Sequence, residues 1–129
     1  MLVLMARVLL VTGLDATVEA VGVLAWAHGV SRSAVVGLMT VARPAALDGS
    51  GVEYLSNLRR TRAVAVAVLV AASGWWVIGE RLVGAIIGAV IGPLVIWAWA
   101  HRRIGGVTGD VLGGCQQVAL VGALAVVVA

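Results

Sequence analysis

Long apolar runs separated by short polar stretches dominate the second half of the chain. Residues 63–79 and 82–100 contain no charged side chain, and residues 111–129 are interrupted only by Gln116 and Gln117. A helix that crosses a bilayer needs about 20 mainly apolar residues, with about 17–25 as the usual range. Lipid offers no partner to backbone polar groups, so such runs fold as helices although they are rich in valine and glycine. We therefore predict three membrane-spanning helices in this half.

The first 42 residues are less regular. Arg7, Asp15 and Glu19 interrupt the apolar sequence here. We predict a short apolar segment over residues 2–14 and a longer one over about 17–42. With the three later helices, these segments predict an all-α fold, a polytopic transmembrane bundle of about five membrane segments.

Two other interpretations of this region stay open. One places a single helix over residues 1–27 and a partial helix over residues 31–42; the other is a cleaved signal peptide, which the absence of a cationic stretch before the first apolar run disfavours. In each case Pro44 marks the end of the early apolar region, because the residue before a proline avoids the helical conformation. The whole chain, residues 1–129, is interpreted as one transmembrane domain.

Composition supports a membrane protein and excludes two other classes. The chain has 129 residues, of which 62% are hydrophobic and 12% charged, and its mean hydropathy is +1.11. An ordinary soluble domain is about 45–50% apolar and about 25% charged, and a disordered chain is more polar still. Cys115 is the only cysteine, so an intrachain disulfide is excluded.

The charge distribution predicts an orientation. All nine basic residues are arginines, scattered along the chain rather than gathered in a basic stripe, so nucleic acid is not an expected partner. With five segments, the polar stretches 43–62 and 101–110 lie on one side, and only Arg81 marks the other. The six arginines of the first side are Arg43, Arg59, Arg60, Arg62, Arg102 and Arg103. The positive-inside rule then predicts a multi-pass protein of the cell inner (plasma) membrane, with both polar loops and the N-terminus cytoplasmic and the C-terminus outside.

A repeat of small residues predicts how one helix packs. Gly84, Gly88 and Gly92 recur every four positions. In a membrane helix this spacing places the glycines on one face and lets a neighbouring backbone approach closely. Pro93 follows directly and is expected to bend the helix, because it lacks a backbone N–H.

The start of the last helix has residues suited to binding phosphate. Thr108 is a plausible N-cap, which would place Gly109 and Asp110 in the first turn. Free N–H groups at a helix N-terminus attract anions, and a carboxylate there can hold a divalent cation that bridges to phosphate oxygens. Arg102 and Arg103 would add charge-assisted contacts. The alternative is a capped helix whose arginines mark the membrane edge.

A similar combination of arginine and carboxylate occurs in the first polar stretch, where Arg43 precedes Asp48. Arg32 is unusual because it lies inside an apolar segment, and a charge within the membrane normally faces a polar cavity or a partner. We therefore predict a functional or ion-pairing role for Arg32. His28 and His101 are isolated, and no His or Cys spacing of a metal site occurs.

These polar stretches carry a family resemblance. Residues 103–113, RIGGVTGDVLG, resemble the signature near the C-terminus of cobalamin synthase, which is adenosylcobinamide-GDP ribazoletransferase. The upstream strings agree in order: VSR at 30–32, AR at 42–43 and DGSG at 48–51. The resemblance implies a polytopic inner-membrane transferase that requires Mg²⁺. Such an enzyme joins adenosylcobinamide-GDP to α-ribazole or its 5′-phosphate, with release of GMP, in vitamin B12 biosynthesis.

The resemblance also implies roles for individual residues. Asp110 and Asp48 would be catalytic and would bind Mg²⁺. The groups that bind substrate phosphate would be Arg32, Arg43, Arg103, Thr108 and Gly109. The expected partners are the two substrates, the lipid bilayer, and either further copies of the chain or a complementing N-terminal half.

One departure from the family pattern qualifies this expectation. The family's acidic signature, of the form DGLADxxDG, belongs to its first half and supplies the main metal ligands, and no such string occurs here. The resemblance is therefore to the C-terminal part of the family. It implies a truncated homologue, one part of a split enzyme, or a fragment. The alternative function is a non-catalytic membrane subunit in which the polar stretches only cap helices.

Overall fold

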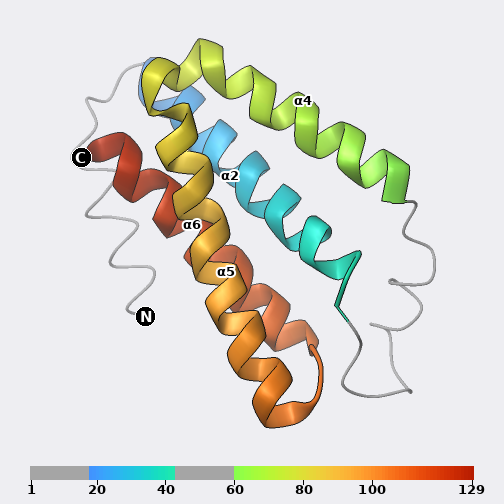
Figure 1. The fold of residues 1–129 in the computed structure, drawn as a ribbon. Coiled ribbons are helices and arrows are strands. Elements are labelled where there is room, and N and C mark those ends of the chain that lie inside the picture. Colours follow the sequence, from blue (N-terminus) through green and yellow to red (C-terminus); the bar gives the residue numbers. More distant parts are fainter. Residues whose placement is uncertain (1–17, 43–59) are drawn as a thin grey trace.

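The computed structural model describes residues 18–42 and 60–129, and the regular elements in these residues are helices. They are α2 (Val18–Met39), α4 (Arg60–Ile78), a short 3-10 turn η1 (Gly79–Arg81), α5 (Leu82–Ile104) and α6 (Gly109–Val128). Successive helices run in alternating directions (Figure 1). The predicted segment 2–14 lies outside the described residues, as do Arg43 and Asp48.

Three stretches of the described chain are long and apolar enough to cross a membrane. They are Ala20–Met39, Arg60–Ile104 and Gly109–Val128. The middle stretch has 45 residues and contains both α4 and α5, which turn back on each other at η1 (Figure 1). The all-α membrane architecture is thereby confirmed, whereas the number of five segments stays a prediction.

The polar stretches are shorter than the hydropathy pattern indicates. The interpretation of 101–110 as a loop was wrong at its start, because α5 continues for another turn through His101 to Ile104. The helix ends at Gly105, whose φ of 73° is left-handed and whose N–H donates to the His101 carbonyl. Hydropathy marks the part of a helix that lipid surrounds, and the backbone hydrogen bonds extend beyond it. Likewise, α4 begins at Arg60, within the stretch interpreted as the first loop.

Helices α5 and α6 form a closely packed antiparallel pair, and the glycine repeat lies between them. A Cβ atom on any of Gly84, Gly88 or Gly92 would lie closer than 3.0 Å to an atom of α6. The α6 partners are Val126, Gly122 and Val118, which also recur every four residues. The predicted packing face is therefore confirmed. Pro93 is buried within α5, and the helix remains continuous through it; the expected bend stays a prediction.

Helix α2 joins this pair to α4. Trp26 is 5% exposed and donates its indole N–H to the Val70 carbonyl of α4 over 2.9 Å. Gly74 makes this approach possible, because a Cβ at that position would collide with the indole ring. The largest group of buried side chains brings α2 together with both α5 and α6, through residues such as Ala27, Ala89 and Leu120.

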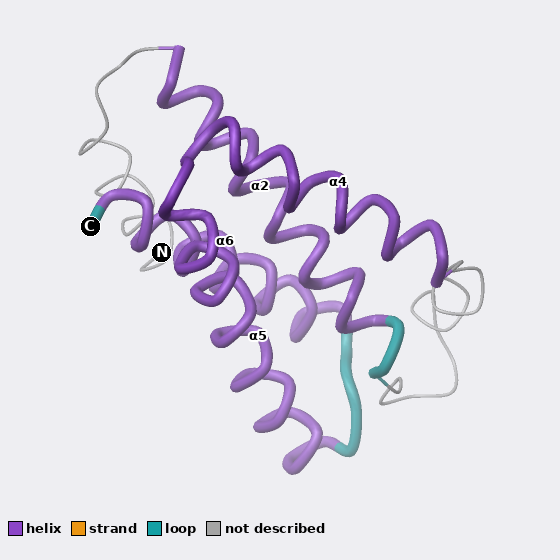
Figure 2. The backbone as a smooth tube through the Cα atoms, turned by 45° about the horizontal axis from the view of Figure 1, so that its top comes forward, coloured by secondary structure: helices purple, strands orange, loops and turns teal. Residues whose placement is uncertain are grey.

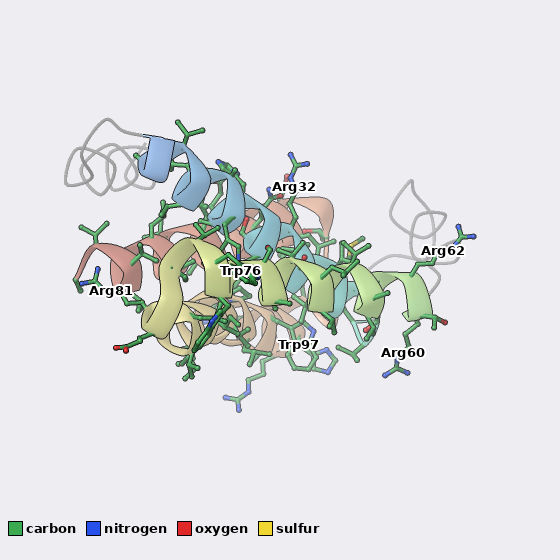
Figure 3. The ribbon with its side chains drawn as sticks, turned by 90° about the horizontal axis from the view of Figure 1, so that it is seen from above. Arg32, Arg60, Arg62, Trp76, Arg81 and Trp97 are labelled. Atoms are coloured by element: carbon green, nitrogen blue, oxygen red, sulfur yellow. The ribbon has the colours of Figure 1, made fainter. Side chains whose placement is uncertain are left out.

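The alternating topology places four helix termini at one end of the bundle. The end of α2, the start of α4, the end of α5 and the start of α6 lie there, and a short loop connects the last two (Figure 2). Arg60 and Arg62 lie at this end and Arg81 at the other (Figure 3). Arg81 donates a hydrogen bond to the Val127 carbonyl, which places a cation at the C-terminus of α6, where it interacts favourably with the helix dipole.

Candidate functional site

The candidate site is the end of the bundle where α6 begins. Thr108 has an extended backbone, with φ of −113° and ψ of 167°, and its side-chain oxygen accepts a hydrogen bond from the Val111 N–H over 3.4 Å. The predicted N-cap is thereby confirmed. The N–H groups of Gly109 and Asp110 lie in the first turn, where a helix provides no internal acceptor. This terminus therefore offers two backbone donors and the positive end of the helix dipole to an anion.

Three charged side chains lie on the two helix ends that meet at this loop. Arg102 and Arg103 are exposed on the last turn of α5, and Asp110 is exposed on the first turn of α6. The connection between the two helices consists only of residues 105–108. The two arginines and the carboxylate are thus held by rigid helix ends rather than by a long loop.

An aromatic pair at the end of α5 was not predicted from the sequence. The ring of His101 stacks on Trp97, with ring centroids 5.9 Å apart and an interplanar angle of 25°. The indole nitrogen of Trp97 is buried without a hydrogen-bond partner among the described residues. The four-residue spacing on one helix is the signal that sequence reasoning could have used, because residues i and i+4 share a helix face.

A second group of buried residues connects the end of α2 with the start of α6. Val35 and Leu38 of α2 pack against Cys115 of α6, together with half-buried side chains from the starts and ends of the neighbouring helices. Cys115 also donates its S–H to the Pro93 carbonyl over 3.6 Å. The last turns of α2 are therefore fixed beside the first turns of α6. The predicted site residues Arg43 and Asp48 follow α2 along the chain but lie outside the described residues.

Arg32 lies apart from this helix start. It occupies α2 seven positions before Met39, which is about 10 Å along the helix axis. Its side chain is exposed and projects from α2 on the side away from α4 (Figure 3). Among the described residues, none of the hydrogen bonds joins Arg32 to Arg103, Thr108 or Asp110.

The described residues do not by themselves make a complete metal centre. No group of three or more His, Cys, Asp or Glu side chains in residues 18–42 and 60–129 is placed to hold a metal ion. Asp110 is the carboxylate that the described chain contributes at this end, since Glu80 lies in η1 at the other end. Mg²⁺ is commonly bound through one or two carboxylates together with substrate phosphate, and a single carboxylate beside an anion site is compatible with that mode.

Comparison with known proteins gives one family. A sequence model described as cobalamin-5-phosphate synthase matches residues 1–128. The chain is 34% identical to the adenosylcobinamide-GDP ribazoletransferase of Leptothrix cholodnii over 111 residues, which cover 78% of this chain and 40% of that protein. It is 27% identical to the protein of the same name from Geotalea daltonii over 84 residues, covering 65% of this chain and 34% of that protein. The chain thus matches two fifths or less of the length of either relative. No solved structure matches it.

Proposed function

The chain belongs to the cobalamin-5-phosphate synthase family, and from that membership we propose that it takes part in ribazole transfer to adenosylcobinamide-GDP. In this reaction a hydroxyl of α-ribazole, or of its 5′-phosphate, attacks the phosphorus on the cobinamide side of the pyrophosphate. The bond to GMP then breaks and GMP leaves. The observation that carries the proposal is the family match over residues 1–128, supported by two relatives that are adenosylcobinamide-GDP ribazoletransferases.

The start of α6 is the proposed binding place for the pyrophosphate. The free N–H groups of Gly109 and Asp110 would donate to phosphate oxygens, and the Thr108 cap fixes the direction in which they point. Arg103, on the last turn of α5, would form a charge-assisted contact to the same group. Arg43 is proposed to add a second guanidinium. These groups would stabilise the charge that develops on the transferring phosphoryl group.

We propose that Asp110 and Asp48 hold Mg²⁺ jointly with the substrate phosphate. The ion would neutralise charge on the phosphate oxygens when bound. Asp110 supports this proposal because it is exposed and lies in the first turn of α6, beside the donors that would hold the phosphate. For Arg32 the distance from the helix end favours the ion-pairing role over direct phosphate binding.

The proposed setting is the inner membrane, with the α6 start on the cytoplasmic side. α4 has 19 residues and α5 has 23, so they measure about 28 and 34 Å. Each is long enough to cross a hydrocarbon core of about 30 Å. Together with α2, α6 and the predicted segment 2–14, they would give about five crossings. The six arginines of the two polar stretches support the orientation.

The experiment measures GMP release in reconstituted vesicles. The full chain is assayed with adenosylcobinamide-GDP, α-ribazole and Mg²⁺, both alone and with the part of the Leptothrix cholodnii relative that lies outside the matched region. We expect Asp110→Ala to reduce GMP release by about 100-fold or more, the scale of removing a group that stabilises transition-state charge. Glu80→Ala is the matched control, because Glu80 is also exposed but lies at the other end of the bundle. Equal rates for the two variants would remove Asp110 from the mechanism.

A second candidate is a subunit that contributes binding groups without catalysing transfer alone. The single described carboxylate at the α6 start favours it. The same assay separates the two candidates. A catalytic chain releases GMP alone, whereas a subunit does so only when the complementing part is added. Absence of GMP release under both conditions would contradict the proposed function.

A further inference from the structure

One face of α2 carries two polar side chains, His28 and Arg32, beside apolar ones. Val21, Ala25, His28 and Arg32 are all exposed, and their spacing places them on a single side of the helix. We call these four residues the outer face of α2. The opposite side of α2 carries the buried residues that contact α4, α5 and α6. The outer face is therefore unpartnered in the described bundle.

The position of Arg32 makes exposure to lipid costly. It lies fourteen positions after Val18 and seven before Met39, inside the candidate span Ala20–Met39. The nearer helix end is the C-terminal one, but side chains on a helix lean toward its N-terminus. To reach the nearer membrane surface, the Arg32 side chain would therefore have to extend opposite to the direction in which helical side chains lean. An arginine held at this depth is normally paired or faces a polar environment.

The described chain does not supply the pairing group. Glu80 and Asp110 lie on η1 and at the start of α6, and no ion pair forms among the described residues. Glu19 is on the same helix but thirteen positions earlier, about 20 Å along the axis. The neighbouring hydroxyls of Ser31 and Ser33 donate to the His28 and Gly29 carbonyls, and no hydrogen bond from Arg32 to either forms among the described residues.

A second copy of the chain is a poor occupant for this face. Most homodimers are symmetric about a two-fold axis, so the same patch of each subunit meets its counterpart. Such a contact through the outer face would place Arg32 against Arg32, and like charges in the membrane repel strongly. The charge of the face instead calls for an anionic partner.

We propose that the outer face of α2 is the docking surface for a membrane-spanning helix that carries a carboxylate at the depth of Arg32. The helix packs along Val21 and Ala25, and its carboxylate pairs with the Arg32 guanidinium and accepts a hydrogen bond from His28, one turn away. Such a helix comes from polypeptide outside the described residues. At least three fifths of each matched relative lies outside the match, which leaves room for it. The inference does not depend on the transfer reaction.

The test measures association with a designed helix in phosphatidylcholine vesicles. The full chain carries a fluorescent donor at its N-terminus, and the guest is a polyleucine helix with an acceptor and one glutamate at the depth of Arg32. A second guest has glutamine instead. We expect energy transfer to show about tenfold tighter binding of the glutamate guest, the scale of an interhelical polar contact in lipid. Arg32→Gln should abolish the preference and Arg32→Lys should retain it.

Two further variants keep the result interpretable. Arg62→Gln is the matched control, because it removes an exposed arginine at the start of α4 and should leave the preference unchanged. Arg32→Glu paired with a lysine guest should restore the preference by exchanging the charges. Slow thiol labelling of the buried Cys115 verifies that each variant remains folded.

Four results would overturn the proposal. Equal binding of the glutamate and glutamine guests would show that the face does not select a carboxylate. A preference that persists in Arg32→Gln would place the contact elsewhere. Energy transfer between copies of the chain that disappears in Arg32→Gln would identify a second copy as the occupant. Loss of the preference only on addition of anionic lipid would indicate that lipid phosphate satisfies Arg32, which also contradicts a helix partner.

Discussion

Replacing Gly88 by alanine adds a methyl group where the backbones of α5 and α6 cross. The new Cβ would lie closer than 3.0 Å to the carbonyl group of Gly122. The obstacle is backbone, so no side-chain rotation relieves the collision and the two helices must separate. The adjacent residues Ala89 and Ala123 are fully buried in this crossing and would lose contacts as the helices move.

The magnitude follows from the packing of this interface. Forcing extra volume into a closely packed core costs about 1–3 kcal/mol, and about 1.4 kcal/mol corresponds to a tenfold change in an equilibrium constant. Gly88→Ala should therefore raise the population of open molecules by about 5- to 150-fold. Gly113→Ala is the matched control, because a Cβ there meets no atom within 4 Å. Gly88→Ala and Gly122→Ala should also be less than additive together, since one separation relieves both collisions.

The assay uses the single cysteine as a reporter. Cys115 is fully buried and hydrogen-bonded to the Pro93 carbonyl, so a maleimide reacts with it only when the helices open. In vesicles, the labelling rate of Gly88→Ala relative to the unmodified chain gives the change in the open population. Identical labelling rates for Gly88→Ala and Gly113→Ala would refute the reasoning, because both variants change the backbone propensity and only one creates a collision.

Three other predictions concern single contacts. Trp26→Phe removes the hydrogen bond to Val70 and should lower the free energy of unfolding by about 0.5–1.5 kcal/mol in thermal unfolding, whereas Trp76→Phe, at a side chain 89% exposed, should leave it unchanged. Arg81→Gln removes the cation at the C-terminus of α6 and should lower the free energy of unfolding by about 0.3–1 kcal/mol. A destabilisation that persists in Arg81→Lys would show that the geometry of the guanidinium matters, and not only its charge. Thr108→Ala should lower the free energy of unfolding by about 1 kcal/mol through loss of the N-cap. Faster amide hydrogen exchange, confined to the first turn of α6, would report this loss, and Thr108→Ser should exchange at nearly the rate of the unmodified chain.

Much of the helix layout could be predicted because lipid makes hydropathy a direct signal of helix. The predicted runs 63–79, 82–100 and 111–129 correspond to α4, α5 and α6, with ends that differ by a few residues. The largest difference is at the end of α5, where the helix continues beyond its apolar run to Ile104. The N-cap at Thr108 could also be predicted, since an N-cap depends on residues that are neighbours in the chain.

The contacts between distant helices could not be predicted in this way. The glycine repeat indicated a close approach but not that α6 would be its partner. Nothing in the spacing of Trp26 indicated that Gly74 would accommodate its ring. The sequence placed Arg81 only as a charge on the outer side and did not indicate its hydrogen bond to the C-terminal end of α6. Each of these contacts depends on which helix faces pair, which a pattern read along one segment does not contain.

The arrangement of contacts has a consequence for biogenesis. Helices α5 and α6 are neighbours in the chain and pair as a hairpin, so they can associate as soon as both have entered the bilayer. Helix α2 enters the bilayer early, yet part of its packing surface belongs to α6, the last described helix to be synthesised. Closing such a long loop is slow compared with forming a local hairpin. During synthesis the α2 surface that later packs Val35 and Leu38 against Cys115 therefore stays uncovered until α6 has been made.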